Sequence, residues 1–308
     1  MKILFIDKVH PSLKNDLEEN NYICDESYNL SKKEIEKKIY QYNGIIIRSR
    51  FIIDSKFIEK AKNLKFIARA GSGLENIDIE FAESKKIVCF NASEGNRQAV
   101  AEHAIAMILS LFNNLNRADN EIRKGKWFRE SNRGIEISGK TIALIGYGNN
   151  GSAFANVLKG FGVKILAYDK YLDNYDFQSK MKEIYKQSDI VSLHIPLTEE
   201  TKHLVNDKFI DRFSKDFYLI NTSRGKCVNT KSLVKALKKG KIKGVCLDVL
   251  EYEKTSFEEL SSIGLNSDMK YIIHSKKTIL SPHIAGWTIE SNIKIANVLR
   301  KKILEINL

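Results

Sequence analysis

The chain contains 308 residues, 43% of them hydrophobic and 29% charged, and its formal net charge is +12 at pH 7. This length exceeds what one hydrophobic core usually serves, so two domains are expected. No apolar run approaches the roughly 18 residues of a membrane span. The lysines lie on solvent faces of helical stretches without base-reading motifs, so neither a membrane nor a nucleic-acid partner is expected. The four cysteines show no CxxC spacing, which predicts neither a metal site nor a disulfide framework.

Short apolar runs alternate with helical patterns in the first third of the chain. The predicted strands are KILFID, GIIIRS, LKFIARA and KIVCFNA, and the predicted helices lie around residues 11–20, 31–40, 54–62 and 78–85. Asp7 and Lys8 end the first apolar run early, so it is predicted to be a strand rather than a signal peptide, and a cytoplasmic location is expected. This alternation is typical of parallel α/β layers.

The middle of the chain begins with one long helical pattern over residues 97–124, whose apolar positions recur every three and four residues. Six predicted strands follow: TIALIGYG, VKILAYD, DIVSLHIP, DFYLINTS, IKGVCLDV and TILSPH. Most have a helix between them, which matches the size of one doubly wound nucleotide-binding domain. Residues 254–275 are irregular and polar and are predicted to be a surface insertion, whereas residues 288–305 are predicted to form a helix.

The final helix is too short to be a domain, so we expect it to return to the first part of the chain. The predicted fold therefore has two doubly wound parallel-sheet domains of the α/β class. A Rossmann NAD-binding domain over residues 104–286 is inserted in a flavodoxin-like substrate-binding domain over residues 1–103, which residues 287–308 complete.

A glycine-rich motif marks the predicted cofactor site. Gly146, Gly148 and Gly151 form GYGNNG between the strand TIALI and a helical stretch, which is the context that a dinucleotide-binding turn requires. Asp169 ends the next predicted strand, where its carboxylate can accept hydrogen bonds from ribose hydroxyls and repel a 2′-phosphate. The motif therefore predicts NAD rather than NADP as the cofactor. The alternative is a chance glycine turn with Asp169 as a helix cap.

Three further motifs follow the ends of later strands, where open α/β sheets bind ligands. They are NTSRG with Arg224, LDVLEYE with Glu253, and SPHIAGW with His283. Oxidation of a 2-hydroxy acid needs a base for the hydroxyl proton, which His283 can supply with Glu253 holding its other nitrogen. Arg224 can bind and polarise the substrate. Each residue also has a structural alternative: a surface ion pair for Arg224, a solvated loop position for Glu253 and a helix cap for His283.

These motifs resemble those of the D-isomer-specific 2-hydroxyacid dehydrogenases over almost the whole chain. The shared segments are RAGSGLENID, NASEGNRQAVAEHAIAMIL, ISGKTIALIGYGNNG, HIPLTEETKHLVN, NTSRG, LDVLEYE and SPHIAGWT. The chain is most similar to the short phosphoglycerate dehydrogenases that lack a regulatory domain. The resemblance implies that Arg224, Glu253 and His283 are catalytic, that Ser72 and Gly73 cradle the substrate carboxylate, and that the protein is a homodimer built through its cofactor domains.

The resemblance also implies that Asn96 lies near the substrate and Asp248 near the nicotinamide carboxamide. Beyond the glycines and Asp169, the expected cofactor contacts are Asn149, Asn150, His194, Pro196, Thr201, Thr222 and Asp248. His103 and His203 are expected to be structural, and so is the ring of His194 within the cofactor pocket.

The substrate is less defined than the reaction. IIIRSR resembles the phosphoglycerate dehydrogenase loop whose arginines meet a phosphate, so Arg48 and Arg50 are predicted to bind the phosphate of 3-phosphoglycerate, the reaction that begins serine biosynthesis. A hydroxypyruvate, glyoxylate or D-lactate dehydrogenase is the alternative within the family. A non-catalytic NAD-sensing protein is the alternative from another class, although such a protein has little need of Arg224, Glu253 and His283 together.

Overall fold

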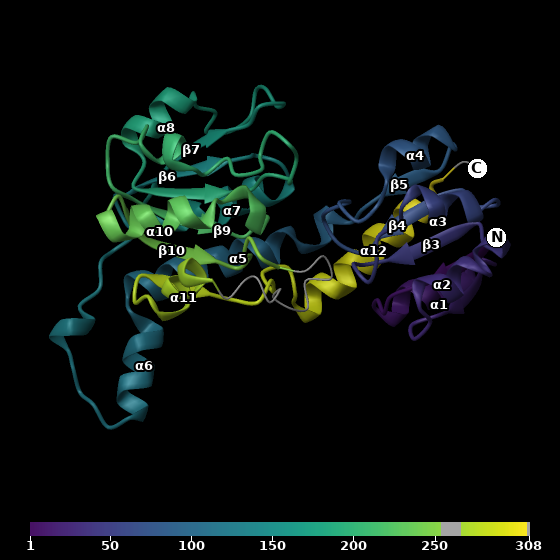
Figure 1. Ribbon diagram of the computed structural model, residues 1–308, viewed down its shortest axis with the longest axis horizontal. Coiled ribbons are helices and arrows are strands. Elements are labelled where there is room, and N and C mark those ends of the chain that lie inside the picture. Colours follow the sequence, from purple (N-terminus) through teal and green to yellow (C-terminus); the bar gives the residue numbers. More distant parts are fainter. Residues whose placement is uncertain (254–265, 307–308) are drawn as a thin grey trace. The chain divides into compact units, whose positions relative to one another are not determined.

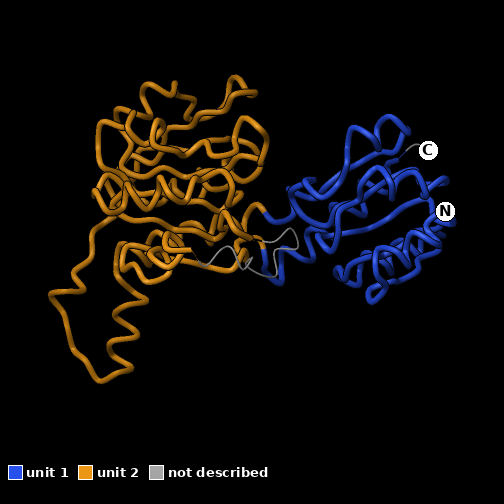
Figure 2. The backbone as a smooth tube through the Cα atoms, viewed as in Figure 1, with its two compact units in different colours: residues 1–96, 255–257, 287–308 blue, residues 97–254, 258–286 orange. Residues whose placement is uncertain are grey.

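The structure is a computed structural model that describes residues 1–253 and 266–306 (Figure 1). Its contacts divide the chain into two compact units (Figure 2). Unit 1 contains Met1–Asn96 and Trp287–Leu308, and unit 2 contains the described residues from Arg97 to Gly286. The division falls inside helix α5 (Ser93–Phe112), earlier than the boundary expected after residue 103.

Unit 1 is built on a parallel sheet of five strands in the order β2-β1-β3-β4-β5. The strands are β1 (Lys2–Phe5), β2 (Ile23–Glu26), β3 (Gly44–Ile47), β4 (Phe66–Arg69) and β5 (Val88–Phe90). The helices are α1 (Pro11–Glu19), α2 (Lys32–Glu36), α3 (Ser55–Lys60), α4 (Ile79–Ser84) and α12 (Ile289–Leu304). This strand order is that of flavodoxin-like folds.

Alternate residues of these strands enter two hydrophobic clusters, because successive side chains of a strand point to opposite faces. Leu4 and Ile45 belong to one cluster, and Ile3 and Phe5 to the other. Helix α12 contributes Ala296, Leu299 and Ile303 to the second cluster, so the last helix packs on the first unit. The sheet is therefore covered on both faces, which all-parallel sheets require.

Unit 2 is built on a parallel sheet of six strands in the order β11-β10-β9-β8-β6-β7. The strands are β6 (Thr141–Ile145), β7 (Lys164–Tyr168), β8 (Ile190–Leu193), β9 (Phe217–Asn221), β10 (Ile242–Leu247) and β11 (Thr278–Leu280). The helices, besides α5, are α6 (Leu115–Arg123), α7 (Asn149–Leu158), α8 (Met181–Gln187), α9 (Asp207–Ile210), α10 (Thr230–Lys239) and α11 (Ser267–His274).

The strand order of unit 2 explains where a ligand belongs. An isolated parallel bridge joins Ala167 of β7 to Gln178. This bridge lies where the third strand of the nucleotide-binding order 3-2-1-4-5-6 belongs. The chain runs from β6 to β7 on one side and then crosses to β8 on the other, so the switch point lies at the carboxyl end of β6. The predicted fold class, a Rossmann domain and a flavodoxin-like domain with parallel sheets, is confirmed.

Three local predictions need correction. The helix expected over residues 97–124 is two helices, α5 and α6, because Asn114 between them adopts a left-handed φ of 54°. Strand β2 was not predicted, since only Cys24 among its four residues is buried. The predicted irregular insertion over residues 254–275 is wrong for 267–274, which form α11 with Met269 and Ile272 buried. Residues 254–265 lie outside the described part of the chain.

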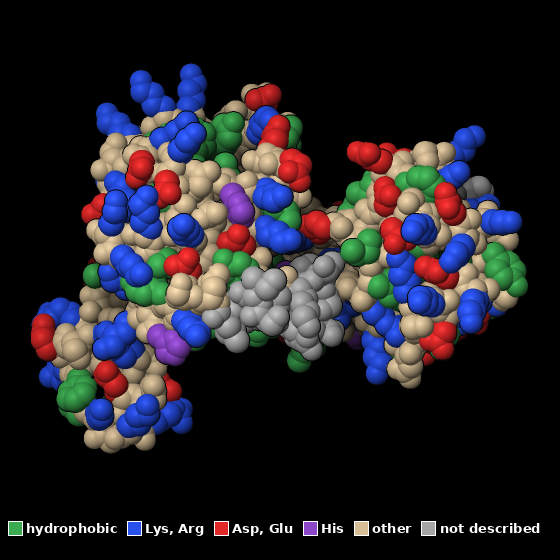
Figure 3. Space-filling model, viewed as in Figure 1, with side chains coloured by type: hydrophobic (Ala, Val, Ile, Leu, Met, Phe, Trp, Pro, Cys, Tyr) green, Lys and Arg blue, Asp and Glu red, His purple; other side chains and the backbone are tan. Residues whose placement is uncertain are grey.

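The distribution of basic side chains and the length of the apolar helices can be compared with what the composition indicates. In the view of Figure 3 the lysine and arginine side chains are spread over both units rather than gathered in one patch. None of the described helices is long and apolar enough to cross a membrane.

Candidate active site

The glycine-rich turn after β6 is shaped by close backbone contacts. Gly146 has a φ of 96°, and a Cβ there would overlap the carbonyl oxygen of His194. A Cβ on Gly151 would overlap the carbonyl oxygen of Gly146. Gly148 is the N-cap of α7; it provides no side-chain cap, and the space beside it is open. The turn therefore leaves the amino end of α7 accessible to an anion such as a pyrophosphate.

Asp169 stands beside this turn at the end of β7. Its Oδ2 accepts a hydrogen bond of 2.8 Å from the backbone N–H of Tyr147, and its Oδ1 accepts bonds of 2.9 and 3.2 Å from Tyr171 and Leu172. A carboxylate has about four acceptor positions. The three backbone bonds therefore fix its orientation and still leave capacity for a ligand hydroxyl.

Two buried polar atoms near the turn and after β9 support a ligand at this edge of the sheet. Asn150 Oδ1, in the first turn of α7, and Thr222 Oγ1 have no hydrogen-bond partner among the described residues. Buried polar atoms without partners are uncommon, because their desolvation is not repaid. Their chemistry, together with the glycine turn and Asp169, fits a dinucleotide.

The segment after β8 forms another side of the glycine turn. His194 bonds to Ser192 Oγ through Nε2 at 2.9 Å, and its ring centroid lies 5.3 Å from that of Phe154. Burial lowers the pKa of His194 from its ordinary 6.5 to about 3, so the ring is neutral. Thr201 Oγ1 donates to the carbonyl of Pro196 at 2.7 Å, which closes the loop that follows. The ring of His194 is half-buried and is held between Ser192 and Phe154.

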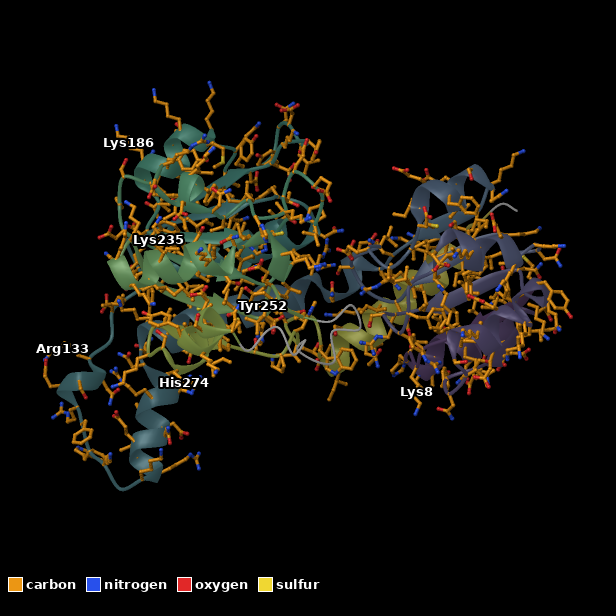
Figure 4. The ribbon with its side chains drawn as sticks, viewed as in Figure 1. Lys8, Arg133, Lys186, Lys235, Tyr252 and His274 are labelled. Atoms are coloured by element: carbon orange, nitrogen blue, oxygen red, sulfur yellow. The ribbon has the colours of Figure 1, made fainter. Side chains whose placement is uncertain are left out.

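The three predicted catalytic residues follow β9, β10 and β11, which are neighbours in the sheet. His283 Nδ1 lies 2.7 Å from Glu253 Oε2, and the two side chains are 23% and 14% exposed. A carboxylate only accepts hydrogen bonds, so His283 carries its proton on Nδ1 and its Nε2 is the basic nitrogen. The other oxygen of Glu253 accepts from the N–H of Leu250. Figure 4 labels Tyr252, the neighbour of Glu253 on this loop.

Arg224 is held close to the Glu253 loop by the glycine that follows it. A Cβ on Gly225 would overlap the carbonyl oxygen of Leu250, so only glycine allows these two loops to touch. Asn221 Nδ2 donates to the carbonyl of Arg224 at 2.9 Å, and Arg224 Nη1 donates to the carbonyl of Ser223 at 2.7 Å. The motif NTSRG is thus a turn with its own internal bonds.

Asp248 holds the loop that carries His283. Asp248 is 1% exposed, and its carboxylate accepts bonds of 2.8 Å from the N–H groups of Ile284 and Ala285. Its carbonyl accepts a bond of 2.7 Å from the N–H of His283, which has a left-handed φ of 56°. Three consecutive N–H groups therefore bond to one residue. The sequence did not indicate this anchoring role of Asp248.

In unit 1 the predicted substrate residues behave differently from one another. Ser72 Oγ donates to Asn96 Oδ1 at 2.7 Å, so the turn with Gly73 and the start of α5 are brought together. The guanidinium of Arg48 lies 3.8 Å from the ring centroid of Trp287, at a distance typical of a cation–π contact.

The guanidinium of Arg50 bonds to the backbone of unit 1. Its Nη1 donates to the carbonyls of Ile6 and Ser27 at 3.0 and 2.8 Å, and its Nη2 donates to that of Leu30 at 2.6 Å. These bonds join three loops of unit 1 and use both terminal nitrogens of the guanidinium. The binding of one phosphate by Arg48 and Arg50 together stays a prediction, and the three carbonyl bonds make Arg48 the better candidate of the two.

A glycine turn at the switch point of a doubly wound sheet, with a paired His and Glu at the same edge, defines an NAD-dependent dehydrogenase. Residues 105–285 match the family described as "D-isomer specific 2-hydroxyacid dehydrogenase, NAD binding domain". The chain belongs to the D-isomer-specific 2-hydroxyacid dehydrogenase family. The predicted family and its cofactor, NAD, are confirmed.

Individual relatives carry different names. The chain is 34% identical to a hydroxypyruvate reductase of Thermotoga maritima, over 91% of this chain and 89% of that protein. It is 35% identical to a D-3-phosphoglycerate dehydrogenase of Methanocaldococcus jannaschii, over 99% of this chain but only 57% of that longer protein. Among solved structures, a D-lactate dehydrogenase of Aquifex aeolicus in complex with NAD and lactic acid is 27% identical, with a TM-score of 0.82 over 99% of this chain and 94% of that one.

Proposed function

We propose that the protein oxidises a D-2-hydroxy acid to the 2-oxo acid with NAD, and that 3-phosphoglycerate is its substrate, giving 3-phosphooxypyruvate for serine biosynthesis. The bond between His283 and Glu253, at the edge of the sheet where the glycine turn lies, carries the proposal. A relative named D-3-phosphoglycerate dehydrogenase aligns with 99% of this chain, which supports 3-phosphoglycerate as the substrate.

The proposed chemistry assigns one task to each catalytic residue. His283 Nε2 takes the proton of the substrate's C2 hydroxyl, and Glu253 stabilises the imidazolium that forms through the bond at Nδ1. Arg224 binds the substrate carboxylate and polarises the oxygen on C2. Bound NAD supplies the acceptor for the hydride that leaves C2. In the reverse direction His283 returns the proton to the oxygen of the 2-oxo acid.

The cofactor is proposed to bind through the glycine turn. The N–H groups at the start of α7 meet its pyrophosphate, and Asp169 accepts from the adenosine ribose hydroxyls. Asp169 also repels a 2′-phosphate, so NAD is proposed to be preferred over NADP. The buried oxygens of Asn150 and Thr222 are the further polar groups offered to the cofactor.

The bonding of Arg50 favours hydroxypyruvate as a second candidate substrate. Its guanidinium is engaged by three carbonyls, so the loop after β3 offers a phosphate fewer cations than its sequence predicts. Hydroxypyruvate has no phosphate and therefore needs fewer cations in its binding site. The relative named hydroxypyruvate reductase, which this chain covers to 89%, favours the same candidate.

One assay separates these candidates. NADH formation is measured with 3-phosphoglycerate, D-glycerate and D-lactate, and NADH consumption with hydroxypyruvate and glyoxylate. The proposal expects the highest kcat/KM within the oxidation series for 3-phosphoglycerate. A preference for D-glycerate and hydroxypyruvate would assign the second candidate, and no turnover of any 2-hydroxy or 2-oxo acid would contradict the proposed function.

We further propose a homodimer that forms through unit 2. Helix α6 has no buried residue, and Trp127 in the loop after it is 76% exposed. In Figure 1 this segment stands away from the sheet of the same unit. Large exposed apolar side chains gather on it: Leu115, Ile122, Trp127, Phe128 and Ile135. Such a patch is typical of an interface, and a second copy of the chain is its proposed occupant.

Light scattering tests the dimer. The wild-type chain is expected at twice its monomer mass, and Trp127→Asp combined with Phe128→Asp is expected to give a monomer. Tyr171→Asp is the control, because Tyr171 is 77% exposed in the same unit but lies outside this segment. A wild-type monomer would contradict the proposal.

A further inference from the structure

A chain of hydrogen bonds runs from helix α5 to the loop of His283. His103 Nε2 lies 2.8 Å from Ser281 Oγ, and that hydroxyl lies 2.6 Å from Asp248 Oδ1. His103 Nε2 is also 3.6 Å from the same carboxylate oxygen. All three residues belong to unit 2, and the reaction proposed above does not use His103 or Ser281.

The chemistry of these groups fixes the direction of each bond. Asp248 already accepts from two backbone N–H groups, so its carboxylate is the acceptor. Ser281 has one hydroxyl proton and donates it to Asp248. Ser281 must therefore accept from His103, which places a proton on Nε2 of His103. His283 has its proton on the opposite nitrogen, Nδ1, because that atom faces Glu253.

Asp248 connects the hydrogen bonds of His103 and Ser281 to the loop that carries His283. Its carboxylate and carbonyl bond to the N–H groups of His283, Ile284 and Ala285. The left-handed backbone of His283 is disfavoured for residues other than glycine, so surrounding bonds must hold it. A buried carboxylate can hold them only while its own orientation is fixed, and Ser281 and His103 approach the oxygen that binds Ile284.

We propose that His103 is a positioning residue for His283, acting through Ser281 and Asp248. The inference rests on the proposed dehydrogenase function, in which His283 is the base. His103 does not touch the substrate in this account. It sets the hydroxyl of Ser281 as a donor toward Asp248, and Asp248 then holds the loop so that Nδ1 of His283 meets Glu253.

The tautomer of His103 tests the proposal without any turnover. Nitrogen-15 spectra of the histidine rings are recorded at mildly alkaline pH, where an ordinary imidazole is neutral. His103 is expected as the Nε2–H tautomer and His283 as the Nδ1–H tautomer. Ser281→Ala is expected to change the His103 signals and to broaden or shift those of His283. A proton on Nδ1 of neutral His103 would overturn the proposal.

Kinetics test the consequence for the reaction. His103→Leu removes the donor to Ser281 and is expected to lower kcat about 10-fold or more, with the KM for NAD unchanged, because small displacements of a catalytic group are costly. His103→Gln keeps an N–H donor and is expected to recover most of the loss. His274→Gln is the control, since His274 lies on α11 and bonds to the carbonyl of Lys270. Figure 4 labels this residue.

The outcomes separate this proposal from the function on which it rests. A kcat of His103→Leu equal to that of the wild type would overturn the positioning role and leave the dehydrogenase assignment intact. So would a rise in the KM for NAD with kcat unchanged, because it would mean that His103 acts on cofactor binding rather than on His283. Failure of the wild-type chain to turn over any hydroxy acid would refute the function, whereas the tautomers would still decide the bonding of His103.

Discussion

Charged side chains follow the carboxyl ends of strands in both units. Those after β9, β10 and β11 in unit 2 differ in their bonding partners from those after β3 in unit 1. In the first group, His283 and Glu253 bond to each other, and the bond at Nδ1 makes Nε2 the basic atom. In the second, the guanidinium of Arg50 bonds to the carbonyls of Ile6, Ser27 and Leu30.

The role of a charged residue at a strand end therefore depends on what its polar atoms already bind. Bonds from Arg50 to backbone carbonyls hold loops together and leave little for a ligand. The pairing of two titratable groups instead sets the proton on one atom, which prepares the other for chemistry. Mutations test this contrast between the two groups of residues, because some should lower kcat and others should lower the free energy of unfolding.

The largest effect is expected for the base. His283→Ala should lower kcat by roughly 10²–10⁴, the usual contribution of a positioned general base. Steady-state NADH formation measures it, and the melting temperature should stay close to that of the wild type. His274→Ala is the matched control on another element of unit 2. Activity within a few-fold of the wild type would mean that His283 is not the base.

Arg50→Ala should reduce stability rather than binding. The loss of its bonds to three carbonyls is expected to lower the free energy of unfolding by roughly 2–4 kcal/mol, because hydrogen bonds to charged groups are the stronger ones. Urea unfolding measures the change. The KM for 3-phosphoglycerate of the folded enzyme should change little. A large rise in KM without a loss of stability would show instead that Arg50 binds the phosphate.

Arg48→Ala should show the opposite pattern. If Arg48 binds the phosphate, the lost charge-assisted bonds, each worth roughly 1.5–3 kcal/mol, should raise the KM for 3-phosphoglycerate about 10-fold or more. The KM for hydroxypyruvate should rise less, and the difference should shrink at high salt, which screens the interaction. Equal losses for both substrates would favour the substrate without a phosphate.

The smallest effect concerns His194 and pH. Because the folded protein lowers the pKa of His194 to about 3, only the unfolded chain takes up a proton there as the pH falls below the ordinary value of 6.5. Stability from this residue is therefore lost as the pH falls below about 6.5, and the loss between pH 6.5 and 5.5 is expected to be roughly 1 kcal/mol or less. His194→Gln should show a shallower decline in urea unfolding at successive pH values. Identical slopes would contradict burial of a neutral ring.

Sequence patterns predicted the elements that have strong apolar runs. Strands β3 and β6 are buried at every position and coincide with unbroken apolar runs, whereas β2 has one buried residue among four and was missed. Strands β5 and β11 have no buried residue, and only their apolar sequences indicated them. Helix α11 had a signal that the polar composition obscured: Asn266 caps it, and Met269 and Ile272 lie three residues apart. The break at Asn114 depends on a single left-handed residue, which periodicity does not register.

Some features of the candidate site could likewise be predicted from the sequence, and others could not. The placement of Arg224, Glu253 and His283 after three neighbouring strands could be predicted, because the order of parallel strands fixes where their ends meet. The engagement of Arg50 and the chain from His103 to Asp248 could not, because they depend on bonds between residues far apart in the sequence. His103 and Ser281 are 178 residues apart.

His283 and Glu253 are proposed to act as one unit, and a double-mutant cycle measures whether they do. The kcat is measured for the wild type, His283→Ala, Glu253→Gln and the double variant. Since Glu253 acts only through the imidazole, the account predicts that Glu253→Gln lowers kcat in the wild-type background and causes no further loss in the His283→Ala background. Losses that multiply in the double variant would contradict the account, because they would mean that the two residues act independently.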